Sequence, residues 1–432
     1  MKRLLSWLRD HLAWSWVPAS EREASEAVVR NFWLHWFPAK MAEESLSWSY
    51  SLWLGTAAAS LLLITTVTGA ILMVFYVPSV ERAYWSMKDL EFAVSFGWLL
   101  RAQHRWAAHL MVVAVFLHMA RVFFTGAYHG PRALNWLIGI SLLLLTLLFS
   151  FTGYLLPWDQ LAFWAITVGT TIAAAAPLLG PPLRFVLIGG TEIGQQALIR
   201  FYVLHVFTLP AVVLGLLAYH LWRVRKDGGL ACAERLRDER ASCEGDPEPA
   251  KTYALWGVTR GTLVAVSTLA PGEQHALLSV PHVVRRGLLV FLLTFNLTVL
   301  LSLLGRAPLE EAANPMLTPN PAKAPWYFLW LQELVADTTL RIGGFTLSGA
   351  LVGGILIPAA LLLLACLWPL LDRSPAECEG VWWPRARRWQ VLVFALVTLA
   401  IVALIYVGQA LRGPYWHIYW PWEVRPGLPT RF

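Results

Sequence analysis

Residues 104–122 read HRWAAHLMVVAVFLHMARV, and residues 205–224 read HVFTLPAVVLGLLAYHLWRV. Both segments are long and apolar, and each carries one histidine near either end. These four histidines are His104 and His118 in the first segment and His205 and His220 in the second. The members of a pair stand fourteen or fifteen residues apart. At ~1.5 Å of rise per residue they are separated by roughly 21–22 Å along a helix, about four turns. Each pair is therefore expected on one side of its helix, at two depths.

The composition predicts an integral membrane protein. Hydrophobic residues make up 57% of the 432 residues and charged ones 14%, well below the usual soluble share of about a quarter. Seven apolar runs reach the ~20 residues that a membrane-spanning helix needs. They lie at 51–76, 104–124, 133–156, 198–222, 287–305, 346–371 and 389–411. The fold class is therefore all-α, with seven transmembrane helices.

The basic residues predict the orientation in the bilayer. With the N-terminus inside, the inside segments carry 22 of the 34 lysines and arginines and the outside segments 12. The positive-inside rule then places the N-terminus in the cytoplasm and the C-terminus outside. The formal net charge of +7 reflects this bias, so it does not indicate a nucleic-acid partner. We expect a multi-pass protein of a bacterial inner membrane or an equivalent energy-transducing membrane.

The chain divides into four expected parts. Residues 1–50 begin with a basic amphipathic stretch that is expected to lie on the cytoplasmic surface. Residues 51–225 hold four spans and all the candidate ligands. A polar cytoplasmic linker at 226–286 separates them from the last three spans, in residues 287–432.

Two helices that face each other, each with an imidazole at two depths, could hold two metal centres stacked across the membrane. An ionisable side chain inside the hydrocarbon usually has a specific partner, and bis-histidine haem is the obvious candidate. The four cysteines form no CxxCH motif, which disfavours covalent c-type haem. His109 is five residues from His104 and nine from His118, so it faces away from both and is expected to pack or to form hydrogen bonds.

Four glycines repeat the histidine spacing. Gly55 and Gly69 lie fourteen residues apart in the first span, and Gly139 and Gly153 lie fourteen apart in the third. Glycine inside a helix costs about 1 kcal/mol relative to alanine. Close helix packing is one explanation. The matching spacing favours another, in which each glycine leaves room for the edge of a flat macrocycle.

With these residues in place, the chain resembles cytochrome b of the quinol-oxidising cytochrome bc complexes. The fifteen-residue histidine spacing and the PWDQ sequence resemble the plastid-type protein, here followed by a half similar to subunit IV, as in bacterial hybrid cytochromes. The likeness is strong over residues 40–230 and weaker over 285–411. The stretches that carry it are HRWAAHLMVVAVFLHMARVFFTGAYHGPRALNWLIG (104–139), FTGYLLPWDQLAFWAITVGT (151–170) and RFYVLHVFTLPAVVLGLLAYHLWRVRKDGG (200–229).

The resemblance implies the core subunit of a quinol:electron-acceptor oxidoreductase with two non-covalent haem b groups. His104 and His205 would ligate the haem near the outer face, and His118 and His220 the inner one. Electrons from quinol would cross the membrane between the haems, coupled to proton translocation. The implied partners are a Rieske iron–sulfur protein, a cytochrome c-type subunit and a second copy of the chain.

Three arginines match basic residues of the family. Arg105 and Arg121 are similar to residues that meet the haem propionates, although interfacial charges of this kind also snorkel. Arg225 matches a residue near the inner quinone pocket, although it is also an ordinary positive-inside arginine. Leu61 stands where the plastid-type protein anchors an extra haem through cysteine, so no covalent third haem is expected.

The resemblance also implies an outer quinol pocket. The segment Trp164–Gly180 is broken by prolines after its apolar start and is expected to form short surface helices. Trp326 and Tyr327 match a Pro-Glu-Trp-Tyr motif, but Pro325 stands where the proton-accepting glutamate is expected. This variant resembles bacterial cytochromes associated with menaquinol, which makes menaquinol the candidate substrate.

The substitution by proline leaves the proton acceptor open. Glu333, six residues past Tyr327, is the nearest carboxylate along the chain and could lie at the edge of the pocket. Burial there would bring its pKa towards the working range of a base. A water-exposed glutamate at the rim is the alternative, and Asp337 and Lys323 are further candidates.

Two other functions remain open at this point. A di-haem membrane anchor of a dehydrogenase or hydrogenase would explain the histidines but not the Trp-Tyr motif in the C-terminal half. A haem-free transporter would place its polar residues near the midplane, whereas the four histidines lie towards the two faces.

Overall fold

The structure is a computed structural model that describes residues 40–227, 229–231, 276–343, 345–375 and 378–423. Most of the expected N-terminal segment (1–50) and of the expected linker (226–286) lies outside the described residues.

The seven expected spans are confirmed among the described residues. Each is a helix long and apolar enough to cross a membrane. The spans are Leu54–Phe75 (α5), Gly97–Phe124 (α7), Gly130–Leu155 (with α8, Ala133–Leu155), Gln195–Lys226 (with α11, Gln195–Val203, and α12, Leu209–Lys226), His282–Leu304 (inside α14, Ser279–Leu304), Gly349–Leu371 (with α17, Ile357–Leu371) and Arg385–Leu411 (with α18, Arg388–Tyr406).

The second span begins seven residues earlier than the apolar run, which started at 104. The polar residues Arg101 and Gln103 precede that run in the sequence, but both are buried within α7. The guanidinium of Arg101 donates to the Ala307 carbonyl at 2.9 Å and contacts Glu91 at 3.3 Å. A buried polar group is tolerated when it has such partners, so the helix extends through these residues.

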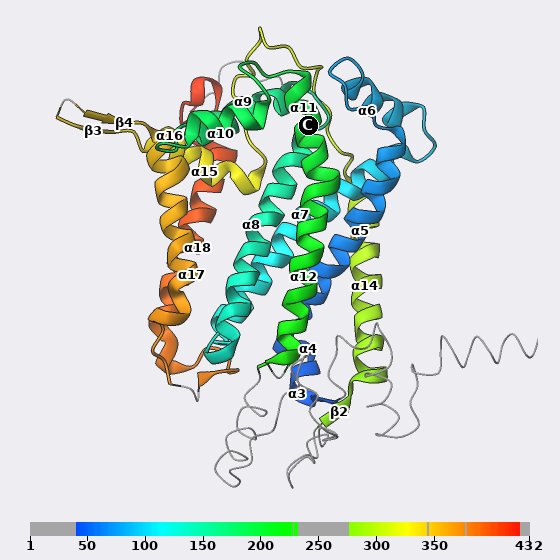
Figure 1. The fold of residues 1–432 in the computed structure, drawn as a ribbon, viewed down its shortest axis with the longest axis vertical. Coiled ribbons are helices and arrows are strands. Elements are labelled where there is room, and N and C mark those ends of the chain that lie inside the picture. Colours follow the sequence, from blue (N-terminus) through cyan, green and yellow to red (C-terminus); the bar gives the residue numbers. More distant parts are fainter. Residues whose placement is uncertain (1–39, 228, 232–275, 344, 376–377, 424–432) are drawn as a thin grey trace, which may run out of the picture.

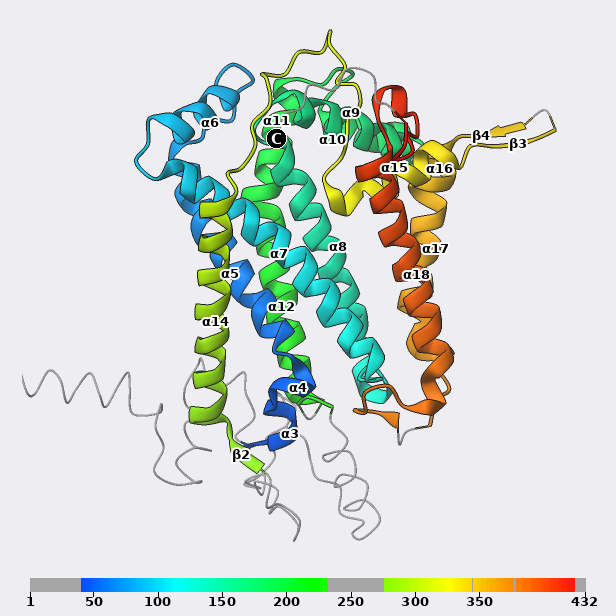
Figure 2. The ribbon, with the colours of Figure 1, turned by 180° about the vertical axis from the view of Figure 1, so that it is seen from behind.

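The spans form one bundle with two distinct ends (Figures 1 and 2). One end carries short helices that lie across the tops of the spans: α6 (Ala83–Phe92), α9 (Gln160–Ala174), α10 (Gly180–Ile188) and α15 (Trp326–Asp337). We call it the α15 end. The opposite end carries α3 (Glu43–Leu46) and α4 (Trp48–Ser51), and we call it the α3 end.

The few strands are short and lie at the ends of the bundle. At the α3 end, β1 (Lys40–Ala42) pairs antiparallel with β2 (Ala276–Leu278). At the α15 end, β3 (Leu340–Ile342) pairs antiparallel with β4 (Phe345–Leu347) in a hairpin that projects from the bundle (Figure 1).

The connection between α8 and α11 forms the short helices α9 and α10, as expected. Asp159 caps α9, because its Oδ1 accepts a hydrogen bond from the Ala162 amide at 2.9 Å. Its Oδ2 accepts from the Glu310 amide at 3.2 Å. The PWDQ sequence therefore binds the segment that leads to α15 and holds the two halves together at this end.

A buried polar cluster joins the halves at the α3 end. Tyr128, in the turn between α7 and α8, donates to Asp372 Oδ2 at 2.5 Å, and Arg387 contacts the same oxygen at 3.3 Å. Burial alone would raise the pKa of Asp372, but hydrogen bonds from His129 and Tyr128 hold it well below its usual range. The side chains of Asp372 and Arg387 are both fully buried. Water cannot solvate either charge, so each charge is stabilised by the other.

Candidate functional site

The structure brings His104 and His205 together near the α15 end. Their ring centroids are 6.3 Å apart, with an interplanar angle of 75°. His205 lies in a π-helical turn, Leu204–Thr208. Pro210 follows at the start of α12 and has no N–H to donate to the preceding turn, which favours the widened turn. Such π turns are frequent at functional sites.

His118 and His220 form the matching pair towards the α3 end. Their centroids are also 6.3 Å apart, and their planes meet at 83°. The two pairs join the same two spans at two depths, as the spacing predicted.

The separation of the rings fits one ion between each pair. Two metal–nitrogen bonds of ~2.0–2.1 Å, taking zinc–imidazole as a guide, and two ring radii of ~1.1 Å add up to about 6.3 Å. No group of three or more His, Cys, Asp or Glu side chains suited to a metal is found among the described residues. An ion held by one of these imidazole pairs would need further ligands, which the macrocycle of a haem would supply.

Two threonines set the tautomer of the pair near the α15 end. Thr68 Oγ1 lies 2.9 Å from His104 Nδ1 and donates its own hydrogen to the Ile64 carbonyl. Thr152 Oγ1 lies 3.1 Å from His205 Nδ1 and donates to the Leu148 carbonyl. Each hydroxyl can therefore only accept from the imidazole, which places the ring hydrogen on Nδ1 and leaves Nε2 free to bind a metal.

These threonines were not among the residues predicted from the sequence. The signal was available, because each directly precedes one of the repeated glycines, as Thr68-Gly69 and Thr152-Gly153.

The four glycines each face one of the four histidines. A Cβ added at Gly153 would lie 2.6 Å from His205 Cε1, and one at Gly69 or Gly55 would lie 3.1 Å from Cε1 of its histidine. Gly69 faces His104, and Gly55 faces His118. At Gly139 the added Cβ would make an ordinary contact of 3.8 Å with His220. Three of the four positions therefore leave little or no room for a side chain beside the rings.

The three expected arginines lie in different surroundings. Arg121 is 3% exposed near the α3 end, with its guanidinium 4.5 Å from the ring centroid of Tyr50. Arg105 Nε lies 3.1 Å from His109 Nε2 at the other end. Arg225 is half-buried in the last turn of α12.

The Trp-Tyr motif begins α15, and Pro325 is its N-cap. Tyr327 is buried, at 8% exposed, and Trp326 is half-buried. Trp326 Nε1 donates to His109 Nδ1 at 2.9 Å, so His109 joins this motif rather than the ligand pairs.

Glu333 is fully buried, and Arg412 donates to it at 2.9 Å and 3.2 Å. The alternative of a water-exposed glutamate at the rim is therefore wrong. Arg412 also binds Asp337, and Lys323 donates to the Gln409 carbonyl at 2.9 Å. No pattern along the chain predicts this pair, because Arg412 lies 79 residues beyond Glu333. Burial raises the pKa of Glu333, as expected, and the hydrogen bond from Arg412 opposes this rise.

Leu61 is buried on α5 among Ile64, Ala107 and Met111. It therefore acts as a packing residue of the bundle, and it offers no thiol to which a haem could attach.

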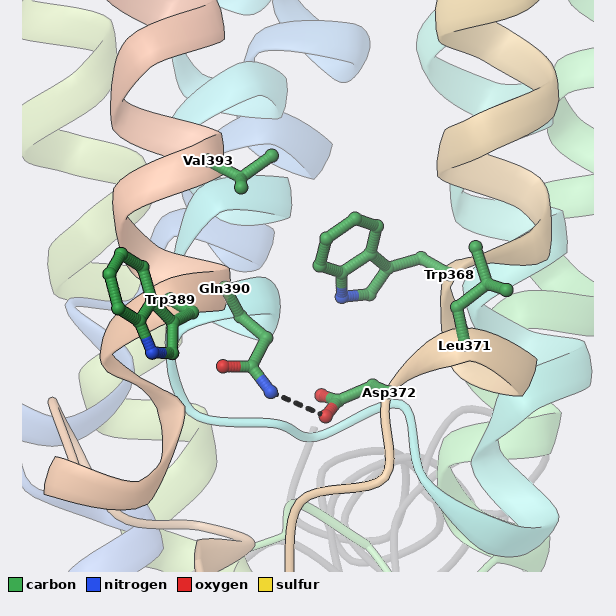
Figure 3. Close-up of a pocket in the computed structure, with 6 residues that line it drawn as sticks. All are labelled: Trp368, Leu371, Asp372, Trp389, Gln390 and Val393. Carbon is green, nitrogen blue, oxygen red and sulfur yellow. Dashed lines mark hydrogen bonds between the residues drawn. The ribbon is translucent and has the colours of Figure 1, made fainter.

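A separate cavity of about 160 Å³ lies between α17 and α18 (Figure 3). Its only acidic side chain, Asp372, already accepts hydrogen bonds from Gln390, Tyr128 and Arg387. The rest of its lining is mostly apolar, and none of the four paired histidines belongs to it.

Comparison with known proteins gives matches over both halves. The family described as "Cytochrome b/b6/petB" matches residues 39–228, and "Cytochrome b(C-terminal)/b6/petD" matches residues 312–420. A menaquinol:cytochrome c reductase cytochrome b subunit of Geobacillus thermodenitrificans is 45% identical over 166 residues, which are 38% of this chain and 74% of that protein. Cytochrome b6 of Heliobacterium modesticaldum is 43% identical over 38% of this chain and 78% of that protein.

The fold also matches a solved structure. A chain of the structure described as "Hyperthermophilic respiratory Complex III" superposes with a TM-score of 0.64 over 94% of this chain and 91% of that chain. At 24% identity this likeness shows the fold alone.

Proposed function

The chain belongs to the cytochrome b/b6 family, and we propose that it is the di-haem cytochrome b subunit of a quinol-oxidising complex of the cytochrome bc type. Family membership implies haem b and quinone as its cofactor and substrate. The finer assignments, namely two non-covalent haems and their ligands, are part of the proposal. One observation supports the proposal above all others. The same two spans bring two pairs of histidines together at two depths, and in each pair the ring centroids are 6.3 Å apart.

In this proposal His104 and His205 hold the haem near the α15 end, and His118 and His220 hold the other. Thr68 and Thr152 keep Nε2 of the first pair unprotonated, and Gly55, Gly69 and Gly153 leave room for the imidazole rings. Arg105 and Arg121 are proposed to neutralise the propionates. When bound, the haems supply one-electron transfer across the membrane, while the protein sets ligation and spacing.

We place the outer quinol pocket at the α15 end, beside Trp326 and Tyr327, and the inner quinone pocket near Arg225. The positive-inside bias puts the α15 end outside, so quinol protons are released there and taken up at the cytoplasmic side. The proposed partners are a Rieske iron–sulfur protein, a cytochrome c-type subunit and a second copy of the chain. Menaquinol is the proposed substrate, since the similar protein of Geobacillus thermodenitrificans is a menaquinol:cytochrome c reductase cytochrome b subunit.

Purification of the intact complex from membranes tests this function. Two b haems per chain in the reduced-minus-oxidised optical spectrum, with quinol oxidation by the complex that contains a Rieske subunit, are the expected results. Two haems without quinol oxidation would favour the membrane anchor of a dehydrogenase or hydrogenase, and no extractable haem would favour a transporter.

Alanine substitutions at the glycines are expected to weaken haem binding to different extents. Gly153→Ala is expected to weaken or abolish the haem held by His205, because the added Cβ would lie 2.6 Å from the imidazole. Gly139→Ala is the matched control: its Cβ would lie 3.8 Å from His220, and both haems should be retained. Haem content and the optical spectrum measure the difference. Equal effects at the two positions would contradict the role given to Gly153.

The haems are expected to be non-covalent. Leu61 is a packing residue, and α5, α7, α8, α11 and α12 contain no cysteine. Denaturing gel electrophoresis followed by haem staining should therefore leave this polypeptide unstained. A stained band at 48.4 kDa would contradict the prediction and direct attention to the cysteines of the linker.

A further inference from the structure

His109 connects two parts of the chain that are far apart in sequence. It lies in the first half of α7, and its ring stacks against Trp326 at a centroid distance of 6.4 Å and an angle of 23°. Tyr327 meets it edge-on at 5.6 Å. The first turn of α15 is thus tied to α7 through this imidazole, although His109 and Trp326 are 217 residues apart.

The hydrogen bond from Trp326 determines which ring nitrogen of His109 carries the hydrogen. The indole N–H and the N–H at Arg105 Nε can both only donate, and a neutral imidazole can accept at only one nitrogen. The contact from Trp326 to Nδ1, at 2.9 Å, is shorter than the contact from Arg105 to Nε2, at 3.1 Å, so we assign Nδ1 as the acceptor. A neutral imidazole has one acceptor and one donor, which leaves the hydrogen on Nε2. Arg105 Nε, also a donor, lies 3.1 Å from this Nε2. Two N–H groups therefore face each other, and neither can accept from the other.

An oxygen atom beside these two groups would resolve the conflict, because it could accept from His109 Nε2–H and from Arg105. The surroundings favour a flat aromatic molecule as the carrier of that oxygen. Trp106 lies 6.0 Å from the His109 ring, and Trp326 and Tyr327 complete an aromatic wall. Aromatic rings of this kind bind other rings by stacking and by edge contacts. His109 and Trp326 are both half-buried rather than fully buried.

We propose that His109 is the residue that binds the head group of quinol in the outer pocket, through a hydrogen bond from Nε2–H to a quinol oxygen. Arg105 Nε is the second donor to the same oxygen, which leaves the terminal N–H groups of this guanidinium for the haem propionate. Trp326 positions the imidazole. This inference rests on the proposed function and adds a substrate contact to it. Pro325 has no side-chain group for this purpose, and Glu333 is committed to Arg412.

Three substitutions at position 109 separate contact with the substrate from a structural role. His109→Leu removes both nitrogens. His109→Gln places an amide N–H near the former Nε2 but fits the Nδ1 position poorly. His109→Asn is the reverse, since its amide can still accept from Trp326 but does not reach the substrate.

Each variant is measured as the intact complex in membranes, with haem spectra as the control for assembly. We expect both haems to remain and His109→Leu to raise the KM for the quinol by roughly tenfold, the loss of about one good hydrogen bond. His109→Gln should restore most of the affinity, and His109→Asn should behave like the leucine variant. If His109→Asn is normal and His109→Gln is impaired, the role is structural and the proposal is wrong. A leucine variant with an unchanged KM would also overturn it.

Photolabelling provides a readout that does not depend on turnover. An azidoquinone activated by light in the wild-type complex should label the tryptic peptide Trp106–Arg121, which contains His109, and excess unlabelled quinol should suppress the labelling. Labelling of other peptides alone would contradict the proposal. Failure of the proposed function is distinguishable, because the wild-type complex would then oxidise no quinol at all.

Discussion

Replacement of His104 by leucine is expected to abolish the same haem signal that replacement of His205 abolishes. These two rings face each other at 6.3 Å across α7 and the π turn before α12. A haem held between these two imidazoles would lose one of its protein ligands with either substitution. His118→Leu and His220→Leu should abolish the other signal, since their rings form the second pair. Reduced-minus-oxidised spectra and haem extraction measure both losses.

Double variants sharpen this prediction. His104→Leu with His205→Leu should lose no more haem than either single variant, because both act on one centre. His104→Leu with His118→Leu should lose both haems, although the two residues are on one helix. His109→Leu, also on α7, is the control that should keep both. Loss of the same component from the His104 and His118 single variants would refute the arrangement of one centre above the other.

The ligand pairs could be predicted from the sequence because they depend on local periodicity. Spacings of fourteen and fifteen residues place two side chains on one face of a helix, whatever the rest of the chain does. The alternating direction of the spans then determines which histidines share a depth. The glycines follow the same rule, and each faces a histidine in the structure.

The outer site could not be predicted in the same way, because its contacts join distant segments. His109 was expected to pack or to form hydrogen bonds, and the sequence could not show that its partner is Trp326, 217 residues away. Glu333 was expected at the edge of a pocket because it is the nearest carboxylate along the chain. Distance along the chain does not reveal that Arg412, from the end of the last span, reaches it.

Replacement of Arg412 by methionine is expected to be among the most destabilising single changes in the C-terminal half. Its guanidinium holds Glu333, whose side chain is fully buried, with a contact of 2.9 Å. Removal of one partner from a buried ion pair leaves an uncompensated charge, at a cost of about 3–5 kcal/mol. The side chain of Asp337, the other carboxylate partner, is 54% exposed, so water can replace the arginine there.

The loss of stability should depend on pH with a definite sign. Burial raises the pKa of Glu333, and the hydrogen bond from Arg412 opposes this rise. Without the arginine the pKa of the folded state should rise further above its unfolded value. The folded variant then binds a proton that the unfolded chain does not, so its stability is retained at low pH and lost as pH rises through the folded pKa. Thermal unfolding of the variant relative to wild type, measured from pH 5 to 8, should show this trend.

Addition of Glu333→Gln to Arg412→Met separates the structural role of this carboxylate from a role as quinol base. The neutral amide removes the buried charge, so the double variant should regain most of the lost stability and lose its pH dependence. If Glu333 accepts the quinol proton, this stable double variant should still oxidise quinol at least tenfold more slowly than wild type. If its task is to anchor α15, turnover should recover together with stability, because Trp326 and Tyr327 on that helix return to their positions beside His109. The buried ion pair with Arg412 supports the second outcome. A double variant that is stable but slow would instead show that Glu333 takes part in quinol oxidation.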